Sequence, residues 1–452
     1  MSIRDRLNGI ETAQRPAALA DSRIALASSR SQLELRVRLH QLLLDRVDLG
    51  RLQKLSPELM RLELKLLTEQ LIDEEQLALS ENERRNLIRD IQYEMLGYGP
   101  LEPLLADPSI SDILVNTHRQ VYVERSGKLE LTEITFNDDQ HLLKIIDKIV
   151  SRVGRRIDES SPMVDARLPD GSRVNAIVSP LAIDGPIMSI RRFAAIPLKM
   201  IDIVELHSIT SPMAELLAAV VAAKLNVLVS GGTGSGKTTL LNILSASIGS
   251  SERVVTIEDA AELQLQQPHV VRLETRPPNI EGKGEIGQRA LVRNALRMRP
   301  DRILLGEVRG AEAFDMLQAM NTGHEGSMAT VHANTPRDAL SRLENMLSMA
   351  EMNMTQRAMR QQIASALTVI VQIGRMVDGQ RKVLSIQEIV GIEGEIITMQ
   401  EIYGFKQTGL SLDGAIQGYF SASGVRPSFM DRLKAYGLKL REDAFDPSRR
   451  TT

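Results

Sequence analysis

The chain has 452 residues, of which 43% are hydrophobic and 25% charged, and its formal net charge at pH 7 is −3. These values are typical of soluble globular proteins, and the length is enough for about three domains. With no cysteine the chain forms no disulfide and no cysteine-ligated zinc site, and without a basic excess and with only 3% aromatic residues a dedicated nucleic-acid-binding function is disfavoured.

The N-terminal segment predicts neither a signal peptide nor a membrane span. Residues 1–6 are charged and no apolar segment follows them. The most apolar stretches, 216–223 and 363–374, are too short to cross a bilayer. Residues 1–30 are rich in Ala, Ser, Arg and Gln, so we expect a disordered or weakly ordered arm there.

A small helical module is predicted over residues 31–96, where leucines recur at helical spacing. Ser56 followed by Pro57 is typical of an N-cap and a first helical residue. Ser80 with Glu83 three residues later has the spacing of a capping box. The module therefore contains at least two capped helices.

An α+β domain is predicted over residues 97–196, beginning at the break Gly97–Pro100. A helix is expected at 139–152. The β-rich segments are expected at 113–115, 121–123, 129–136, 172–178 and 187–193. Residues 197–210 are expected to form a linker.

An α/β domain is predicted over residues 211–452. Ser211 and Pro212 resemble a cap and a first helical residue, opening a helix to Lys224. Strands and helices then alternate, which favours a parallel sheet covered by helices. The expected elements are the strands 226–230, 254–257, 270–273 and 302–305 and the helices 287–298 and 311–320.

The most specific motif is a phosphate-binding loop. An apolar strand leads into residues that complete G-x-x-x-x-G-K-[ST], and a helix is expected to begin near Lys237. Glycines let backbone N–H groups close around a phosphate, and the positive end of the helix dipole faces that anion. Lys237 would contact the β- and γ-phosphates of ATP, and the Thr238 hydroxyl would bind Mg²⁺. The predicted nucleotide-binding residues are Gly231, Gly232, Thr233, Gly234, Ser235, Gly236, Lys237, Thr238 and Thr239.

Two carboxylates follow predicted strands at the edge where ligands of open α/β sheets bind. Glu307 ends an apolar strand and is expected to serve the magnesium ion, in place of the more usual aspartate. Glu258 ends another strand and is the candidate for polarising the attacking water. Asp259 and Glu262 follow it and fit equally well as charges at the N-terminus of a helix.

Two of the seven histidines, His324 and His332, fall within nine residues. Their spacing does not match a metal pair on a helix, so a zinc site is rejected. Each fits a hydrogen bond to a γ-phosphate or a buried structural role.

Four arginines of the α+β domain, Arg167, Arg173, Arg191 and Arg192, form a basic set. Arginine reaching in from another domain or subunit often meets transition-state charge on a phosphoryl group. Surface ion pairing explains such a set equally well.

The phosphate loop, Ile257–Asp259, Gly306–Gly310 and Thr322–His332 occur in an order that resembles the secretion ATPase superfamily of type II and type IV secretion and type IV pili. In that superfamily they correspond to the Walker A, Asp box, Walker B and His box motifs. Further runs resemble its Tad pilus branch, the CpaF family: Pro162–Asn175, Leu273–Asn279, Arg289–Pro300 and Met316–His324. The resemblance covers roughly residues 35–440.

The resemblance implies a RecA-like P-loop motor domain preceded by a PAS-like α+β domain and the helical module, in a homohexamer at the cytoplasmic face of the inner membrane. Glu258 would activate water, Glu307 would serve as the Walker B residue, and His324 and His332 would contact the γ-phosphate. Arg173 and Arg191 fall where the family has arginine fingers. Inner-membrane platform proteins resembling TadB and TadC would be the partners, with pilin reached through them.

The type II secretion and pilus-extension branches carry a four-cysteine zinc module, which a chain without cysteine cannot form. The absence of cysteine is compatible with the Tad, archaeal-type and type IV secretion branches. The leading hypothesis is an ATPase motor for assembly, and retraction, of a Tad pilus. A type IV secretion ATPase exporting protein or DNA is the alternative within the superfamily. A RecA-like nucleic-acid motor and a catalytically silent scaffold are the alternatives from other classes.

Overall fold

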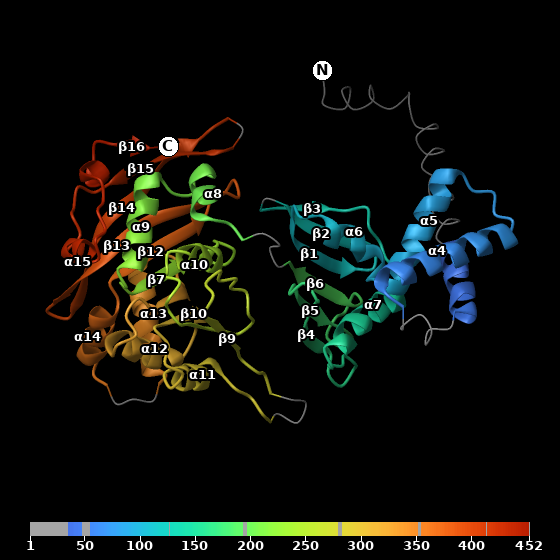
Figure 1. Cartoon of the computed structure of the whole chain (residues 1–452), viewed down its shortest axis with the longest axis horizontal. Helices are drawn as coiled ribbons and strands as arrows, with labels where there is room; N and C mark the ends of the chain where they lie inside the picture. Colours follow the sequence, from blue (N-terminus) through green and yellow to red (C-terminus); the bar gives the residue numbers. More distant parts are fainter. Residues whose placement is uncertain are drawn as a thin grey trace, which may run out of the picture. The chain divides into compact units, whose positions relative to one another are not determined.

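The protein is described here from a computed structural model, over residues 35–47, 55–125, 127–192, 197–278, 283–350, 354–412 and 414–451. The arm predicted at residues 1–30 lies outside these ranges. The described residues form two compact units (Figure 1): one comprises the residues up to 192 except 127–128, and the other comprises 127–128 and the residues from 197 onward. No helix within the described ranges combines the length and apolarity that a bilayer span requires.

The first unit opens with the helical module: residues 35–46 and helices α4 (Pro57–Glu74) and α5 (Glu81–Leu96). Both predicted caps are present. The Ser56 hydroxyl accepts from the N–H of Leu59 (3.4 Å), and Ser80 and Glu83 form the reciprocal capping box. The module has its own buried core, made of Leu39, Leu43, Leu71, Ile72, Leu87, Ile88 and Ile91.

The remainder of the first unit is a six-stranded sheet with α7 (Asp139–Arg152) on its core side. The strand order is β3-β2-β1-β6-β5-β4. The bounds are β1 Ile110–Thr117, β2 Gln120–Arg125, β3 Lys128–Leu131, β4 Met163–Arg167, β5 Arg173–Ile177 and β6 Ile187–Arg191, with the short helices η1 Gly99–Leu101 and α6 Glu102–Ala106 before them. The predicted helix over 139–152 is confirmed, and β4 is a strand that the sequence did not predict.

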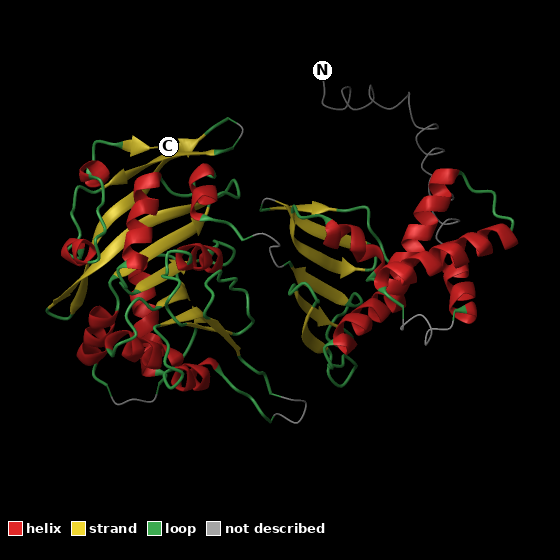
Figure 2. Cartoon of the chain, in the orientation of Figure 1, coloured by secondary structure: helices red, strands yellow, loops and turns green. Residues whose placement is uncertain are grey.

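The second unit is built on one ten-stranded sheet of order β16-β15-β14-β13-β12-β7-β11-β10-β8-β9 (Figure 2). The six strands from β12 to β9 pair in parallel, which confirms the α/β prediction. The strands from β12 to β16 pair antiparallel, which the sequence did not predict. The bounds are β7 Val227–Gly231, β8 Val254–Glu258, β9 Val270–Glu274, β10 Arg302–Val308, β11 Met328–His332, β12 Val369–Arg375, β13 Arg381–Glu393, β14 Ile396–Leu410, β15 Ile416–Ala422 and β16 Arg450–Thr451.

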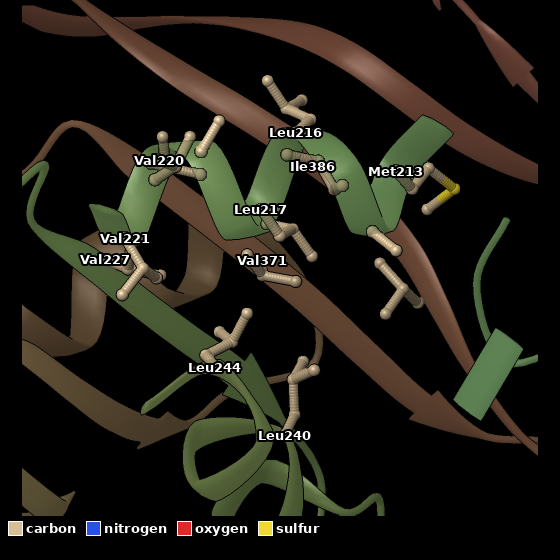
Figure 3. Close-up of a cluster of buried hydrophobic side chains, with 14 of the residues drawn as sticks. Met213, Leu216, Leu217, Val220, Val221, Val227, Leu240, Leu244, Val371 and Ile386 are labelled. Atoms are coloured by element: carbon tan, nitrogen blue, oxygen red, sulfur yellow. The ribbon is translucent and has the colours of Figure 1, made fainter. Parts of the chain in front are cut away.

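Helices cover both faces of this sheet, so its central strands are buried on both sides. Successive residues of β7 fall in different cores: Val227 and Val229 in one, Leu228 in the other. Figure 3 shows part of the first core, which includes Leu217, Val371 and Leu240. The bounds are α8 Met200–Glu205, α9 Ser211–Ala222, α10 Lys237–Ser245, α11 Gln288–Ala295, α12 Glu312–Asn321, α13 Pro336–Ser348, α14 Gln356–Ala366, α15 Met430–Ala435 and η2 Glu442–Phe445.

Two expectations about residues 197–211 differ from the structure. The segment predicted as a linker contains α8, and Ile203 and Ile209 are buried in the core of the second unit because their apolar side chains find a site there. The N-cap of α9 is Thr210, so Ser211 is the first helical residue and not the cap.

Candidate active site

The predicted catalytic strand ends meet at one edge of the parallel sheet. Strands β7, β11, β10 and β8 are adjacent in that order and run in the same direction, so their C-terminal ends lie side by side. Ligands of open α/β sheets bind at this edge. The residues placed there are Gly231, His332, Glu307 and Glu258.

The phosphate loop connects β7 to α10 with two residues in the left-handed region, Gly234 (φ 68°) and Gly236 (φ 95°). A side chain is strained at such φ values, which explains glycine at both positions. The Lys237 ammonium donates to the carbonyl of Gly232 (Nζ–O 2.9 Å), as does the Ser235 hydroxyl (2.8 Å). Helix α10 begins at Lys237, so its first N–H groups and its dipole favour an anion at the loop.

Glu258 is 2% exposed and lies at the end of β8. Its Oε1 accepts from the N–H groups of Glu262 (2.9 Å) and Leu263 (3.0 Å). Its Oε2 is buried and has no hydrogen-bond partner among the described residues. Burial raises the pKa of Glu258 to about 7, and the two N–H groups offset only part of that effect. A carboxylate with one oxygen held and one available, titrating near neutral pH, suits a general base.

The chain after Glu258 is attached to the phosphate-loop helix. The N–H of Gln264 donates to the side-chain carbonyl of Asn242 on α10 (2.9 Å). No helix begins at residues 259–262, so the interpretation of Asp259 and Glu262 as N-terminal helix charges is wrong. The N–H of Glu262 instead orients the Glu258 carboxylate.

Glu307 is joined to Asp259 through Arg309, a residue that the sequence analysis did not single out. Arg309 donates to the carboxylate of Glu307 (Nη2–Oε2 2.7 Å) and lies 3.2 Å from that of Asp259. The hydrogen bond to Glu307 raises the pKa of Arg309, and the negative charges of Glu307, Asp259 and Glu262 raise it further. The position of Arg309 two residues after Glu307 on one strand end was the only sequence signal for this contact.

The two histidines lie at opposite ends of the parallel strands. His332 ends β11 beside Gly231, its register partner on β7. His324 precedes the first residue of β11, near the start of β7, where its neighbour Gly326 bonds Asn226 (N–Oδ1 2.8 Å). The two histidines are apart because the five residues of β11, which ends at His332, extend from one end of the strand to the other. The fold therefore brings His332, and not His324, together with the phosphate loop.

Three of the four arginines form one row across the first sheet. Arg173 on β5 is the register partner of both Arg167 on β4 and Arg191 on β6. Residues directly opposite on antiparallel strands project from the same face. Arg192 is outside the row: its guanidinium donates to the carbonyls of Asp107 and Ile110 and secures a turn.

The donor set at the sheet edge fits Mg²⁺. This ion usually takes one or two protein oxygen ligands and completes its shell with phosphate and water. Thr238 in the first turn of α10 supplies a hydroxyl, and Glu307 supplies a carboxylate. That carboxylate already accepts a hydrogen bond from a cationic group, the Arg309 guanidinium. Helix α10 packs against β10, the strand that carries Glu307.

Residues 94–405 match the family described as type II/IV secretion system protein. The putative conjugal transfer protein Rv3659c of Mycobacterium tuberculosis is 38% identical over 315 residues, covering 68% of this chain and 89% of that protein. The type IV secretion system protein VirB11 of Bartonella henselae is 30% identical, covering 64% and 90%. Among solved structures, the VirB11 ATPase of Brucella suis is 28% identical with a TM-score of 0.35, covering 64% of this chain and 94% of that one. The chain belongs to the type II/IV secretion system protein family.

Proposed function

We propose that the chain hydrolyses ATP at the sheet edge with Glu258 as the general base. The observation that carries this proposal is the Glu258 carboxylate itself, buried beside the strand ends with Oε2 unpartnered among the described residues and a pKa of about 7. A base titrating near the working pH removes a proton from water efficiently. The two N–H groups on Oε1 keep the carboxylate oriented while Oε2 meets the water.

The surrounding residues take the roles that the chemistry of phosphoryl transfer requires. The phosphate loop from Gly231 to Thr239 binds the triphosphate, with Lys237 on the β- and γ-phosphates. Thr238 and Glu307 hold Mg²⁺, which neutralises phosphate charge when bound. His332 lies beside Gly231 and hydrogen-bonds the γ-phosphate. His324 takes no part, because it lies at the other edge of the sheet.

The row of arginines supports a role for the first unit in catalysis. Guanidinium groups side by side attract a polyanion, and Arg173 and Arg191 are proposed as arginine fingers toward ATP. We propose that six copies form a ring at the cytoplasmic face of the inner membrane. The ring would be held there by platform proteins resembling TadB and TadC.

The work that the ATPase drives is proposed to be assembly and retraction of a Tad pilus, supported by the sequence runs that resemble the CpaF family. A second candidate is export by a type IV secretion or conjugation system. The relatives named conjugal transfer protein and VirB11 favour it at least as strongly. Deleting the gene in its host separates the two: loss of pili supports the first, and loss of DNA or protein transfer with intact pili supports the second.

The test of hydrolysis is Lys237→Ala in the full chain. We expect ATP turnover to fall by at least about 100-fold, because the ammonium stabilises charge on the transferred phosphoryl group. Lys434→Ala is the matched control, since Lys434 is exposed and pairs only locally with Asp431. Wild-type turnover in Lys237→Ala would contradict the proposal. Light scattering that shows only monomer at micromolar protein, with and without nucleotide, would contradict the ring.

A further inference from the structure

The hairpin formed by β12 and β13 lies against the phosphate loop. Strand β12 pairs in parallel with β7, and Ile373 is the register partner of Gly231. Where the hairpin passes the loop, Arg375 ends β12 and Arg381 begins β13, and these two are cross-strand partners. Two arginines from late in the sequence therefore flank a loop that binds phosphate.

Three glycines of the loop allow this close approach. A Cβ on Gly231 would stand 2.5 Å from the carbonyl oxygen of Ile373, a distance that real Cβ atoms do not show. A Cβ on Gly236 would stand 3.3 Å from Cδ of Arg381, and one on Gly234 would stand 3.4 Å from a guanidinium nitrogen of Arg375. The glycine pattern of the loop therefore accommodates the hairpin as well as a phosphate.

Arg381 makes a specific bond to the loop. Its Nε donates to the carbonyl of Gly234 at 3.1 Å. Because the peptide group is planar and trans, fixing this carbonyl also fixes the direction of the N–H of Ser235. Glycine at 234 and at 236 gives the backbone freedom to turn these peptide groups over, and the bond from Arg381 removes part of that freedom.

We propose that Arg381 is a positioning residue for nucleotide binding: it restrains the Gly234–Ser235 peptide, whose N–H donates to the carbonyl of Gly232 (3.4 Å) in this structure, and so limits the conformations from which the loop binds phosphate. Ordering the loop in advance lowers the entropy that a ligand must supply when it binds. The guanidinium also adds positive potential at the loop. This inference rests on the proposed function of the loop as an ATP site.

Nucleotide affinity of full-length variants tests the proposal. Arg381→Met should raise the Kd for ADP and for ATP about tenfold, the effect of losing one hydrogen bond to a charged group. Because the residue acts on binding, KM for ATP should rise by a similar factor while kcat at saturating ATP stays within about twofold. Arg381→Lys keeps the positive charge without the Nε–H, so a Kd between those of wild type and Arg381→Met would separate the charge from the bond.

Hydrogen exchange of the nucleotide-free protein gives a second readout that does not depend on activity. Amides of residues 232–238 should exchange faster in Arg381→Met and Arg381→Lys, while amides of β8 and β10 stay at the wild-type rate. Arg441→Met is the matched control, because Arg441 is an exposed arginine of the same unit that pairs with Asp443 (Nη2–Oδ2 3.1 Å). Its Kd and its exchange rates should equal those of wild type.

Three results would overturn the proposal: a Kd of Arg381→Met within twofold of wild type, exchange in the loop that does not change, or an equal loss of affinity in Arg441→Met. If Arg381→Met does not fold, Arg381→Lys decides by the same criteria. Lys237→Ala, measured alongside, separates this inference from the proposed function. Only the inference about Arg381 would be rejected if wild type and Arg381→Met both bind ATP tightly and Lys237→Ala binds it weakly. If wild type does not bind ATP, both the inference and the proposed function would be rejected.

Discussion

Gly306 of β10 lies directly against Glu258 of β8: a Cβ on Gly306 would stand 2.8 Å from Cγ of Glu258. The two strands are paired through Leu305 and Ile257, so this approach is built into the sheet. Glycine at 306 therefore makes room for the proposed general base on the neighbouring strand.

Gly306→Ala should displace the Glu258 side chain. We expect kcat for ATP hydrolysis to fall at least about tenfold, and the free energy of unfolding to fall by about 1–3 kcal/mol, the usual result of overpacking a buried site. Steady-state kinetics and denaturant unfolding measure the two effects. Gly287→Ala is the control, because a Cβ there meets nothing within 4 Å, and its kcat should stay at the wild-type value. Wild-type kcat in Gly306→Ala would show that the contact is unimportant.

Glu258→Gln should lower kcat by about 10²–10⁴-fold while leaving the Kd for ATP near the wild-type value, as expected when a general base is removed. The base acts when ionised, and its pKa is about 7. The kcat of wild type should therefore rise with pH through that value and then level off. The residual activity of Glu258→Gln should lack this inflection. A wild-type pH profile that is flat between pH 5.5 and 8.5 would argue against Glu258 as the base.

The raised pKa of Glu258 also predicts how stability depends on pH. The folded state holds the proton more tightly than the unfolded state, whose carboxyl titrates near 4.5. Glu258 therefore contributes up to about 3 kcal/mol to the free energy of unfolding. This contribution is fully present below about pH 4.5 and is lost as the pH rises through about 7. Melting wild type and Glu258→Gln at pH 5 and pH 8 isolates the effect. Glu258→Gln should gain stability relative to wild type at pH 8.

Gln372 should act on His332 through the backbone. Its side-chain amide is 3% exposed and donates to the carbonyls of Ala333 (3.2 Å) and Asn334 (3.0 Å), the two residues that follow His332. Gln372→Met should lower kcat several-fold and cost about 1–3 kcal/mol of stability, because the carbonyls of Ala333 and Asn334 lose a donor. Gln266→Met is the control, since Gln266 is exposed and bonds only to nearby Gln264. A lower stability with unchanged kcat would limit Gln372 to the fold.

Arg302 and Glu252 should matter for stability and not for catalysis. Arg302 is fully buried at the start of β10, opposite the catalytic edge, and binds Glu252 through two bonds of 2.8 Å. Glu252→Gln should cost about 3–5 kcal/mol because it leaves a buried charge without its partner, and the double variant Arg302→Met/Glu252→Gln should cost less. Denaturant unfolding checks both, with kcat of the folded protein expected to stay at the wild-type value.

Local signals predicted the elements whose causes are local. The capping box at Ser80, the helix from Asp139 to Arg152 and the strand-loop-helix of the phosphate site follow from residues within one or two turns of each other. Strand ends carrying Glu258 and Glu307 were likewise predicted, because parallel strands share an edge.

Contacts between distant segments were not predictable in the same way. Arg381 reaches the phosphate loop only because β12 pairs with β7, and no residue near Arg381 signals that pairing. The spacing of His324 and His332 did not show that a strand separates them and carries one away from the site. The row of arginines likewise depends on the register of β4, a strand that the sequence did not predict.

The position of β7 between β11 and β12 has a consequence for how the protein is made. The phosphate loop is synthesised before β11 and β12, the two strands that flank β7 in the sheet. Arg381 follows Gly234 by 147 residues. Contacts so distant along the chain form slowly. A nascent chain that ends before residue 381 carries the complete motif and still lacks Arg381, so the loop acquires this neighbour only late in the synthesis of the unit.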